Sequence, residues 1–346
     1  MPQKINILGY TLDQLMDTFI GLGLSKLDAK RVFPWIHVKL EKSFDNMSDV
    51  PMKVREFLKE HCTLSRGNCV ALRKSIDGTQ KALIGFENGE VETVLIPEEN
   101  RCTVCVSTQV GCSMGCKFCH TGTQRFTCNL TSAEIMSQII FWKDNFHVTN
   151  IVFMGMGEPL LNFDNLSSSL SLLLSSKAHN FSRNKITVST CGIVGDSFIK
   201  LADFGVKLAV SLHAPNDEKR KSIMPIANKY SIDQIIAISR DYLKRSNTKK
   251  ITFEYLLLKD VNDTIDDAIE LSKIARKVPC KINLIVYNDW AGSSLHASTL
   301  DTANAFSREL MSRGVRATIR KSRGSDIFAA CGQLKTELNG AIPPRS

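Results

Sequence analysis

Short apolar segments alternate with longer amphipathic segments from about residue 100 to residue 320. The apolar segments are Thr103–Ser107, Asn150–Met154, Lys185–Ser189, Lys207–Leu212, Ile251–Leu257, Lys281–Tyr287 and Arg316–Arg320. The amphipathic ones are Ser132–Phe146, Asn165–His179, Ile232–Arg245, Thr264–Lys277 and Thr299–Arg313. Repeated βα units with near-continuous apolar strands predict a parallel sheet covered by helices. Six or seven units are too few for a closed eight-stranded barrel. We therefore expect an α/β fold, a partial (β/α)6 TIM-type barrel, with active-site residues at the carboxyl ends of its strands.

Three cysteines, Cys112, Cys116 and Cys119, follow the first of these strands in a Cys-x3-Cys-x2-Cys array. Three thiolates in one short loop are able to hold three corners of a [4Fe–4S] cluster, which leaves one iron open to a small molecule. S-adenosylmethionine (SAM) chelates such an iron through its amino and carboxylate groups, so the array predicts a radical-SAM enzyme. A zinc site with His120 or Cys128 as fourth ligand is the alternative. Zinc sites more often repeat Cys-x2-Cys pairs, which favours the iron–sulfur interpretation.

The composition is that of a soluble protein that binds a metal centre. Among 346 residues, 43% are hydrophobic and 23% are charged. No apolar run approaches the roughly 18–20 residues that span a bilayer, and the first residues do not resemble a signal peptide. We expect no membrane association and a cytoplasmic location. Six of the eleven cysteines lie between Cys102 and Cys128, a clustering that indicates a site rather than disulfides.

The net charge of +9 is compatible with a polyanionic partner such as RNA. It is equally compatible with a mildly basic protein that binds no nucleic acid. Charge therefore leaves this question open.

The chain divides into four parts. Residues 1–65 predict a helical accessory domain, with helices ending near Leu22, beginning at Ser25 and covering Met52–Glu60. Its many lysines and arginines suit an RNA-binding surface, or alternatively a lid that packs on the larger domain. Residues 66–97 predict a small β extension with strands Cys69–Ser75, Gln80–Phe86 and Val91–Ile96, because Asp77-Gly78 and Asn88-Gly89 are hairpin signals. Residues 98–325 form the barrel, and residues 326–346 a C-terminal segment.

A second motif, Met154-Gly155-Met156-Gly157-Glu158-Pro159, ends the strand after the cysteine array. Glycines at a strand end let the backbone approach a ligand closely. Glu158 is placed to accept a hydrogen bond from the amino group of SAM. In most proteins such a turn is an ordinary βα loop, and only its position after a cluster motif makes it a candidate cofactor contact.

Four motifs in order carry a resemblance to a known family: Cys105 to Cys119, GMGEPL, SLHAPND (Ser211–Asp217) and AACGQL (Ala329–Leu334). Together they resemble the radical-SAM adenine-C2 RNA methyltransferases, and the similarity covers nearly the whole chain. That family modifies one adenosine of 23S rRNA in the peptidyl-transferase centre and, in many bacteria, an adenosine next to a tRNA anticodon. The resemblance implies 23S rRNA and tRNA as substrates, a reducing partner such as flavodoxin or ferredoxin, and a monomer.

The resemblance also implies the cofactor residues. One [4Fe–4S] cluster is expected on Cys112, Cys116 and Cys119. The SAM contacts fall, one by one along the chain, on Gly157, Glu158, Ser189, Ser211, Leu212, His213 and Asn288. Two SAM molecules are consumed per turnover. Taken singly, Ser189 and Asn288 are ordinary residues at strand ends.

Cys331, Cys105 and Glu92 match the family's catalytic residues. In the implied mechanism Cys331 takes a methyl group from one SAM, and the radical made from a second SAM removes a hydrogen from that methyl group. The sulfur-bound methylene radical adds to carbon 2 of adenine; an electron and the carbon-2 proton are then lost, with Glu92 as the proposed base. Cys105 finally attacks the Cys331 sulfur, which frees the product and leaves a disulfide. Without the resemblance, Glu92 is an ordinary edge charge.

Two expectations come from the thiol chemistry itself. Because a thiolate is the nucleophile, the basic residues Arg320, Lys321 and Arg323 are candidates for lowering thiol pKa values. The disulfide also requires Cys331 to approach Cys105. Alpha carbons more than about 7 Å apart would demand a moving loop, for which Arg323–Leu334 is the candidate.

Two functional alternatives remain open from the sequence. A related class methylates carbon 8 of the same adenosine with the same cysteines, and a zinc-stabilised RNA-binding protein would need no catalysis. The chain also departs from the family pattern after Asn288, where Asp289-Trp290-Ala291-Gly292 replaces a proline-rich turn, and at the additional Cys128.

The N-terminal helices and the basic tract Arg313–Arg323 are the candidate contacts for RNA phosphates. The expected target is an adenine that leaves its stack.

Overall fold

A ten-stranded sheet forms the centre of the protein, for which a computed structural model describes residues 4–290 and 292–335. Seven of its strands are parallel: β6 (Arg101–Cys105), β9 (Asn150–Phe153), β10 (Ile186–Thr190), β11 (Lys207–Ser211), β12 (Ile251–Leu257), β13 (Cys280–Val286) and β14 (Ala317–Arg320). They lie side by side in sequence order. Helix separates each of the first six from the next parallel strand; between β6 and β9 the short strands β7 (Gln109–Val110) and β8 (Cys128–Asn129) come as well. The prediction of an α/β partial barrel is confirmed.

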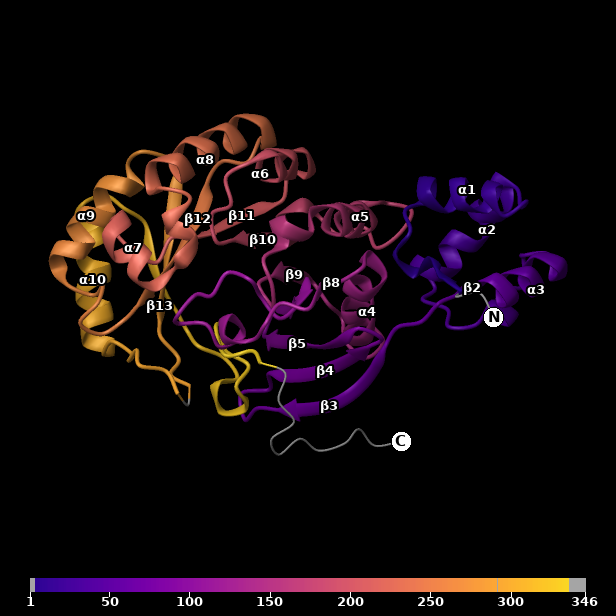
Figure 1. Cartoon of the computed structure of the whole chain (residues 1–346), viewed down its shortest axis with the longest axis horizontal. Helices are drawn as coiled ribbons and strands as arrows, with labels where there is room; N and C mark the ends of the chain where they lie inside the picture. The colour runs from indigo at the N-terminus through magenta and orange to yellow at the C-terminus, as the bar shows by residue number, and fades with distance from the viewer. Residues whose placement is uncertain (1–3, 291, 336–346) are drawn as a thin grey trace.

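Helices cover the outer face of this curved sheet (Figure 1). They are α4 (Ser132–Lys143), α5 (Phe163–Leu174), α6 (Asp196–Lys200), α7 (Asp217–Ile223), α8 (Ile232–Ser246), α9 (Ile265–Ala275) and α10 (Leu300–Ser312). The short α6 and α7 escape the periodicity argument, because one or two turns carry too little of a repeating pattern. Short 3-10 helices fill the connections: η3 (His120–Thr123), η4 (Pro159–Asn162), η5 (Arg183–Lys185), η6 (Leu201–Phe204), η7 (Pro225–Asn228) and η8 (Ser325–Ile327).

The three hairpin strands predicted from the Asp-Gly and Asn-Gly turns extend the barrel sheet. These are β3 (Asn68–Lys74), β4 (Gln80–Phe86) and β5 (Gly89–Glu98), all antiparallel. The last of them pairs with the first barrel strand, with Val94 opposite Cys105. Glu92, on β5, therefore lies only two residues along its strand from the partner of Cys105.

The N-terminal helices pack at the β6 side of the barrel, where Figure 1 shows them beside α4 and α5. They are α1 (Leu12–Gly21), α2 (Lys26–His37) and α3 (Met52–His61), accompanied by η1 (Ile7–Gly9), η2 (Phe44–Asn46) and the β1–β2 pair (Ile5–Asn6 with Cys62–Thr63). Capping boxes at Thr11 and Ser25 begin the first two helices as the sequence predicts.

Helix α4 is buried on more than one side, because the sheet lies against one face and η1 against another. Its Trp142 is 2% exposed and donates its indole N–H to Thr93 Oγ1 at 3.1 Å, which ties the helix to β5. Its first turn meets η1, where Ser132 Oγ donates to the carbonyl of Gly9 at 2.7 Å. Across the described part of the chain, no helix combines the length and apolar character needed to span a bilayer.

The contact between η1 and α4 gives a test of this domain interface. A Cβ on Gly9 would lie 2.1 Å from the backbone nitrogen of Ala133, a distance no backbone tolerates without moving. We expect Gly9→Ala to lower the free energy of unfolding by roughly 1–3 kcal/mol, the usual cost of overpacking. Gly21→Ala in α1 is the matched control, since nothing lies within 4 Å of its added methyl group. Urea denaturation should show Gly21→Ala to be neutral or stabilising; equal effects of both variants would contradict the interface.

Candidate active site

The cysteine loop, residues 111–127, connects β7 (Gln109–Val110) to β8 (Cys128–Asn129), two short strands that pair with each other apart from the central sheet. Gly111 starts it with φ of +73°, and a Cβ there would lie 2.1 Å from the carbonyl oxygen of Arg125. Two backbone bonds hold the loop between distant parts of the chain: Lys117 N–H donates to the Ile223 carbonyl at 3.0 Å, and His120 N–H to the Gly332 carbonyl at 2.7 Å. The loop is thus fixed both to the barrel and to the C-terminal segment.

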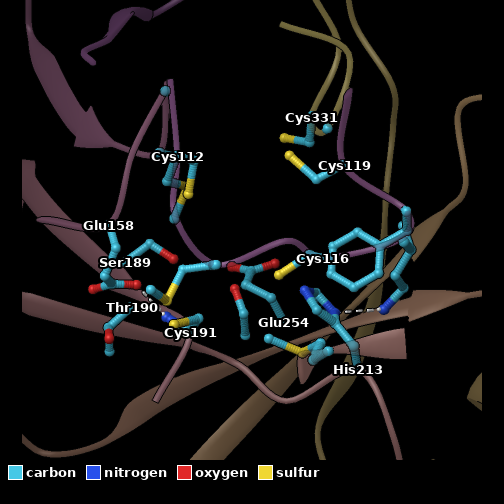
Figure 2. Close-up of a pocket in the computed structure, with 18 of the residues that line it drawn as sticks. Cys112, Cys116, Cys119, Glu158, Ser189, Thr190, Cys191, His213, Glu254 and Cys331 are labelled. Atoms are coloured by element: carbon cyan, nitrogen blue, oxygen red, sulfur yellow. Dashed lines mark hydrogen bonds between the residues drawn. The ribbon is translucent and has the colours of Figure 1, made fainter. Parts of the chain in front are cut away.

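One cavity at the carboxyl ends of the strands collects nine of the predicted site residues. They are Cys112, Cys116, Cys119, Gly157, Glu158, Ser189, Ser211, His213 and Cys331. Figure 2 shows the cysteine loop crossing above the ends of the strands, with Cys331 beside Cys119 and with Glu158 and Cys191 on the opposite side. Residues that are more than 200 positions apart in the sequence therefore meet around one space.

The three loop thiols suit a cluster of several iron atoms. Burial, followed by the charges of neighbouring thiols, raises the pKa of Cys116 well above its ordinary value, and burial raises the pKa of Cys112 to about 11. Three thiolates together in a buried wall repel one another, and bound iron cations remove that cost. In the described residues, no group of three or more His, Cys, Asp or Glu side chains is arranged to hold a metal ion. The fit to the predicted cluster rests on the donor set, three cysteines that line one cavity, because cysteine thiolates are the usual ligands of a [4Fe–4S] cluster.

Glu158 is held rigidly at the cavity edge. Its Oε1 accepts from Leu160 N–H at 3.1 Å, and its Oε2 accepts from Cys191 N–H at 2.7 Å. Its own N–H donates to Gln109 Oε1 at 2.8 Å. Burial raises the pKa of this carboxyl, while the backbone bonds oppose that rise. Each carboxyl oxygen keeps a second lone pair, so Glu158 remains able to accept from a ligand amine.

His213 adopts the left-handed conformation, with φ of +56°, directly after β11. Its Nδ1 accepts from Leu256 N–H at 3.0 Å, and its ring meets Phe118 of the cysteine loop edge-on. Burial, assisted by the nearby Arg220 charge, lowers its pKa to about 3, so the ring is neutral at physiological pH. The side chain therefore acts as a rigid wall between β12 and the loop rather than as a proton carrier.

Cys105 and Cys331 line a smaller adjoining cavity together with Cys119 and Arg320. Both thiols are free. Burial, with the Cys331 charge adding to it, raises the pKa of Cys105 to about 12, and the guanidinium of Arg320 opposes this rise. Arg320 in turn has a raised pKa, chiefly because of Cys331. A cation therefore lies beside both thiols.

Glu92 lies outside the three cavities of this region and beneath the C-terminal segment. Its Oε1 forms an ion pair with Lys81 at 2.8 Å, and its Oε2 accepts from Lys335 N–H at 2.9 Å. Lys81 also donates to the carbonyl of Phe328 at 3.0 Å. Burial raises the pKa of Glu92, and Lys81 acts against it. In this arrangement Glu92 anchors the segment that carries Cys331, and its role as a base stays a prediction.

Two further predicted contacts do not line the cluster cavity. The side chain of Leu212 is fully buried; its N–H donates to the carbonyl of Glu254 at 3.1 Å, and its carbonyl accepts from Arg220 Nε at 3.2 Å. Asn288 lines the larger cavity inside the barrel. Their contacts with SAM stay predictions.

Sequence reasoning missed Arg220 and Glu254. Arg220 is fully buried in α7 and joins two strand ends, since its Nη2 donates to the carbonyls of Cys191 at 2.6 Å and Ser211 at 3.3 Å. Glu254 points into the cavity from the middle of β12 (Figure 2). Arg220 had no signal among its charged neighbours in Asp217–Ile223. A lone carboxylate inside the apolar segment Ile251–Leu257 was a signal for Glu254.

The loop that follows Asn288, where the chain departs from the family pattern, packs on the cysteine loop. Trp290 stacks on His120 with ring centroids 4.5 Å apart and donates its indole N–H to the Phe118 carbonyl at 3.3 Å. Gln333 Nε2 donates to the Asp289 carbonyl at 3.2 Å. The unusual residues therefore join the cysteine loop to the C-terminal segment. Ala291 lies outside the described residues.

Comparisons with known proteins agree with this geometry. The radical SAM superfamily matches residues 106–272, and the ribosomal RNA large subunit methyltransferase N-terminal domain matches residues 5–64. A Francisella tularensis subsp. novicida (strain U112) protein named dual-specificity RNA methyltransferase RlmN is 43% identical over 97% of this chain and 94% of its own length. Its namesake from Rhodopseudomonas palustris (strain ATCC BAA-98 / CGA009) is 41% identical over 97% and 90%. The crystal structure of a radical SAM methyltransferase from Sphaerobacter thermophilus has a TM-score of 0.90, at 38% identity, covering 96% of this chain and all of that one.

The ion pair beneath the C-terminal segment gives a pH-dependent test. Lys81→Met removes the cation from a carboxylate that is 2% exposed, which should cost roughly 3–5 kcal/mol of unfolding free energy at pH 8. The pKa of Glu92 is already raised by burial, so its charged form is the costly one; the deficit should shrink as acid protonates it. Lys59→Met, which breaks an exposed pair with Asp45, should change stability little at either pH. A Lys81→Met deficit that is constant from pH 8 to pH 5 would contradict this assignment.

Proposed function

Since this chain belongs to the RlmN family of radical-SAM RNA methyltransferases, we propose that it methylates carbon 2 of an adenosine in 23S rRNA and in tRNA, by way of an S-methylcysteine on Cys331. The observation that carries this proposal is the position of Cys331. It lines the cavity that contains the three loop cysteines and also the smaller cavity that contains Cys105. One thiol therefore faces both the place where a methyl group would arrive and the thiol that would resolve an adduct.

The cofactor residues follow from the cavity lining. Cys112, Cys116 and Cys119 would hold one [4Fe–4S] cluster, and SAM would contact Gly157, Glu158, Ser189, Ser211, Leu212, His213 and Asn288. When bound, these groups supply a methyl group in one event and a hydrogen-abstracting 5′-deoxyadenosyl radical in the other, which requires two SAM molecules per turnover. A reducing protein such as flavodoxin or ferredoxin would deliver the electron.

The thiols of the chain carry the transfer. Cys331, as the thiolate, accepts the methyl group, and its sulfur then links the transferred carbon to adenine. Arg320 lies beside both thiols and stabilises their thiolate forms. Cys105, as the thiolate, attacks the Cys331 sulfur, so that a disulfide forms and the sulfur–carbon bond breaks; the carbon leaves with the electron pair of that bond and takes up a proton, which completes the methyl group on adenine. Glu92 would remove the carbon-2 proton, for which it must first exchange its contacts with Lys81 and Lys335.

The setting of the reaction follows from the substrate. Ribosomal and transfer RNA are made and assembled in the cytoplasm, where we place this monomeric enzyme. Its net charge of +9 complements RNA phosphates.

The position of the added methyl group on adenine tests the proposal directly. After anaerobic reaction of the reconstituted enzyme with SAM, a reductant and an RNA fragment, nucleoside mass spectrometry should detect 2-methyladenosine. Finding 8-methyladenosine instead would reassign the regiochemistry while leaving the radical mechanism in place. Colourless protein that holds zinc and methylates nothing would support the RNA-binding alternative.

Variants that lack one of the two thiols should stop the reaction at different steps. Cys331→Ala should abolish both S-methylation of the protein and methylation of RNA, because the methyl acceptor is gone. Cys105→Ala should still form the Cys331-linked adduct but not release it, which a denaturing gel would show as an RNA–protein species. Cys128→Ala is the control, since this thiol lines none of the three cavities. RNA methylation by Cys331→Ala, or inactivity of Cys105→Ala without any adduct, would refute the respective role.

A further inference from the structure

The interior of the partial barrel is an open cavity of about 680 Å³. It begins at the amino ends of the parallel strands and ends at Ala330, Cys331 and Arg320. Alternate residues of most of the strands line it, as expected for side chains on one face; on β12 and the residue before it these are Lys250, Thr252 and Glu254. This interior space meets the cluster cavity, since Met154, Glu254, Ile285, Arg320 and Cys331 line both.

Cations gather at the outer end of this space. Lys207, Lys250, Lys281 and Arg316 stand at or next to the first residues of four neighbouring parallel strands. Among the described residues, none of these four forms an ion pair, whereas Arg101, on β6, pairs with Glu98. Burial lowers the pKa values of Lys207 and Lys281; the charge of Glu254 acts against this at Lys281, while neighbouring cations lower both pKa values further. Like charges gathered at one end of a cavity destabilise a fold unless an anion offsets them.

The inner end holds a buried carboxylate, Glu254, close to Arg320. Glu254 is 5% exposed, and its Oε1 accepts from Asn283 Nδ2 at 3.0 Å. Its Oε2 is buried with no hydrogen-bond partner in the described part of the protein. A buried carboxyl oxygen without a donor is costly, which points to a donor that comes from a ligand.

This polarity matches a nucleotide, which has phosphate at one end and, in adenosine, an exocyclic amine at the other. The amine is the only hydrogen-bond donor on the base edge of adenine. Most of the proposed cofactor residues line the cluster cavity, while Cys331 also lines the barrel interior, so the interior gives a second approach to its sulfur.

We propose that the target nucleotide of the RNA enters the barrel interior, with phosphates at Lys207, Lys250, Lys281 and Arg316 and the adenine amine donating to Glu254. The inference rests on the proposed function, since it names the route by which the RNA substrate of that same site arrives. It assigns Glu254 to base selection and the four cations to positioning.

The cation cluster is tested by RNA binding to the full-length holoenzyme. Lys207→Glu/Lys250→Glu should weaken binding of a substrate RNA fragment at least about tenfold at 0.15 M salt. The slope of log K against log salt should fall by roughly 1.4, or about 0.7 for each lost single-strand phosphate contact. Lys200→Glu/Lys273→Glu is the matched control, because it makes the same charge change at exposed positions on α6 and α9. Thermal unfolding confirms that both variants are folded.

Base selection is tested by a ratio within each variant. Wild-type enzyme should modify RNA with adenosine at the target roughly ten- to a hundredfold more efficiently, in kcat/KM, than RNA with purine riboside, which lacks the amine. Glu254→Ala should bring this ratio close to one, and Glu254→Gln, which keeps an acceptor, should restore most of it. An unchanged ratio in Glu254→Ala would overturn the assignment of Glu254.

The outcomes separate this inference from the proposed function. Equal RNA affinity and salt slope in the two double variants would overturn the route, even where wild-type enzyme methylates RNA. Absence of RNA methylation by wild-type enzyme would instead overturn the proposed function, whatever the binding data show.

Discussion

The position of Cys331 depends on a buried ion pair in a different part of the chain. The segment that follows β14 has little secondary structure of its own, and the antiparallel strands hold it in place. Lys81 and Glu92, on adjacent strands, bond each other and the backbone at Phe328 and Lys335. Closer to β14 along the chain, Asp326 accepts a hydrogen bond from Ser75 Oγ at 2.6 Å. Because these strands continue the barrel sheet through β6, Cys105 and the support of Cys331 belong to one rigid framework.

In this framework the residue that anchors the Cys331 segment is also the residue assigned as the catalytic base. The same Glu92 that resemblance assigns as a base has both oxygens engaged in holding the segment. If Glu92 is the base, its removal of a proton would be linked to movement of the Cys331 segment, since a segment that moves away releases the Lys335 contact. The Trp290 loop and His120 add a second attachment on the side of the cysteine loop. The loop expected to move, Arg323–Leu334, is thus held by polar contacts that can exchange and by the burial of Ala329 and Leu334.

The sequence was sufficient for features with a local pattern. Strand and helix periodicity predicted the barrel, and the glycine turns predicted β3, β4 and β5. The cysteine spacing and the GMGEP turn predicted most of one cavity wall, because parallel strands bring their carboxyl ends together. What depends on tertiary pairing was not predictable: Val94 opposite Cys105, the buried Arg220 that joins two strand ends, and the four cations that meet although each has ordinary neighbours in sequence. Glu254 was visible in the sequence as a charge in an apolar strand, but its proposed role in binding the base rests on the buried Oε2 atom that has no hydrogen-bond partner in the described part of the protein.

The central claim is that Cys105 and Cys331 act on each other across one small cavity. Disulfide mapping by mass spectrometry after a single turnover, with no thiol reductant present, tests it most directly. A Cys105–Cys331 disulfide should appear in an amount equal to that of methylated RNA, with Cys112, Cys116 and Cys119 not joined to either. Methylated RNA accompanied by two reduced thiols, or by a disulfide between other cysteines, would contradict the account.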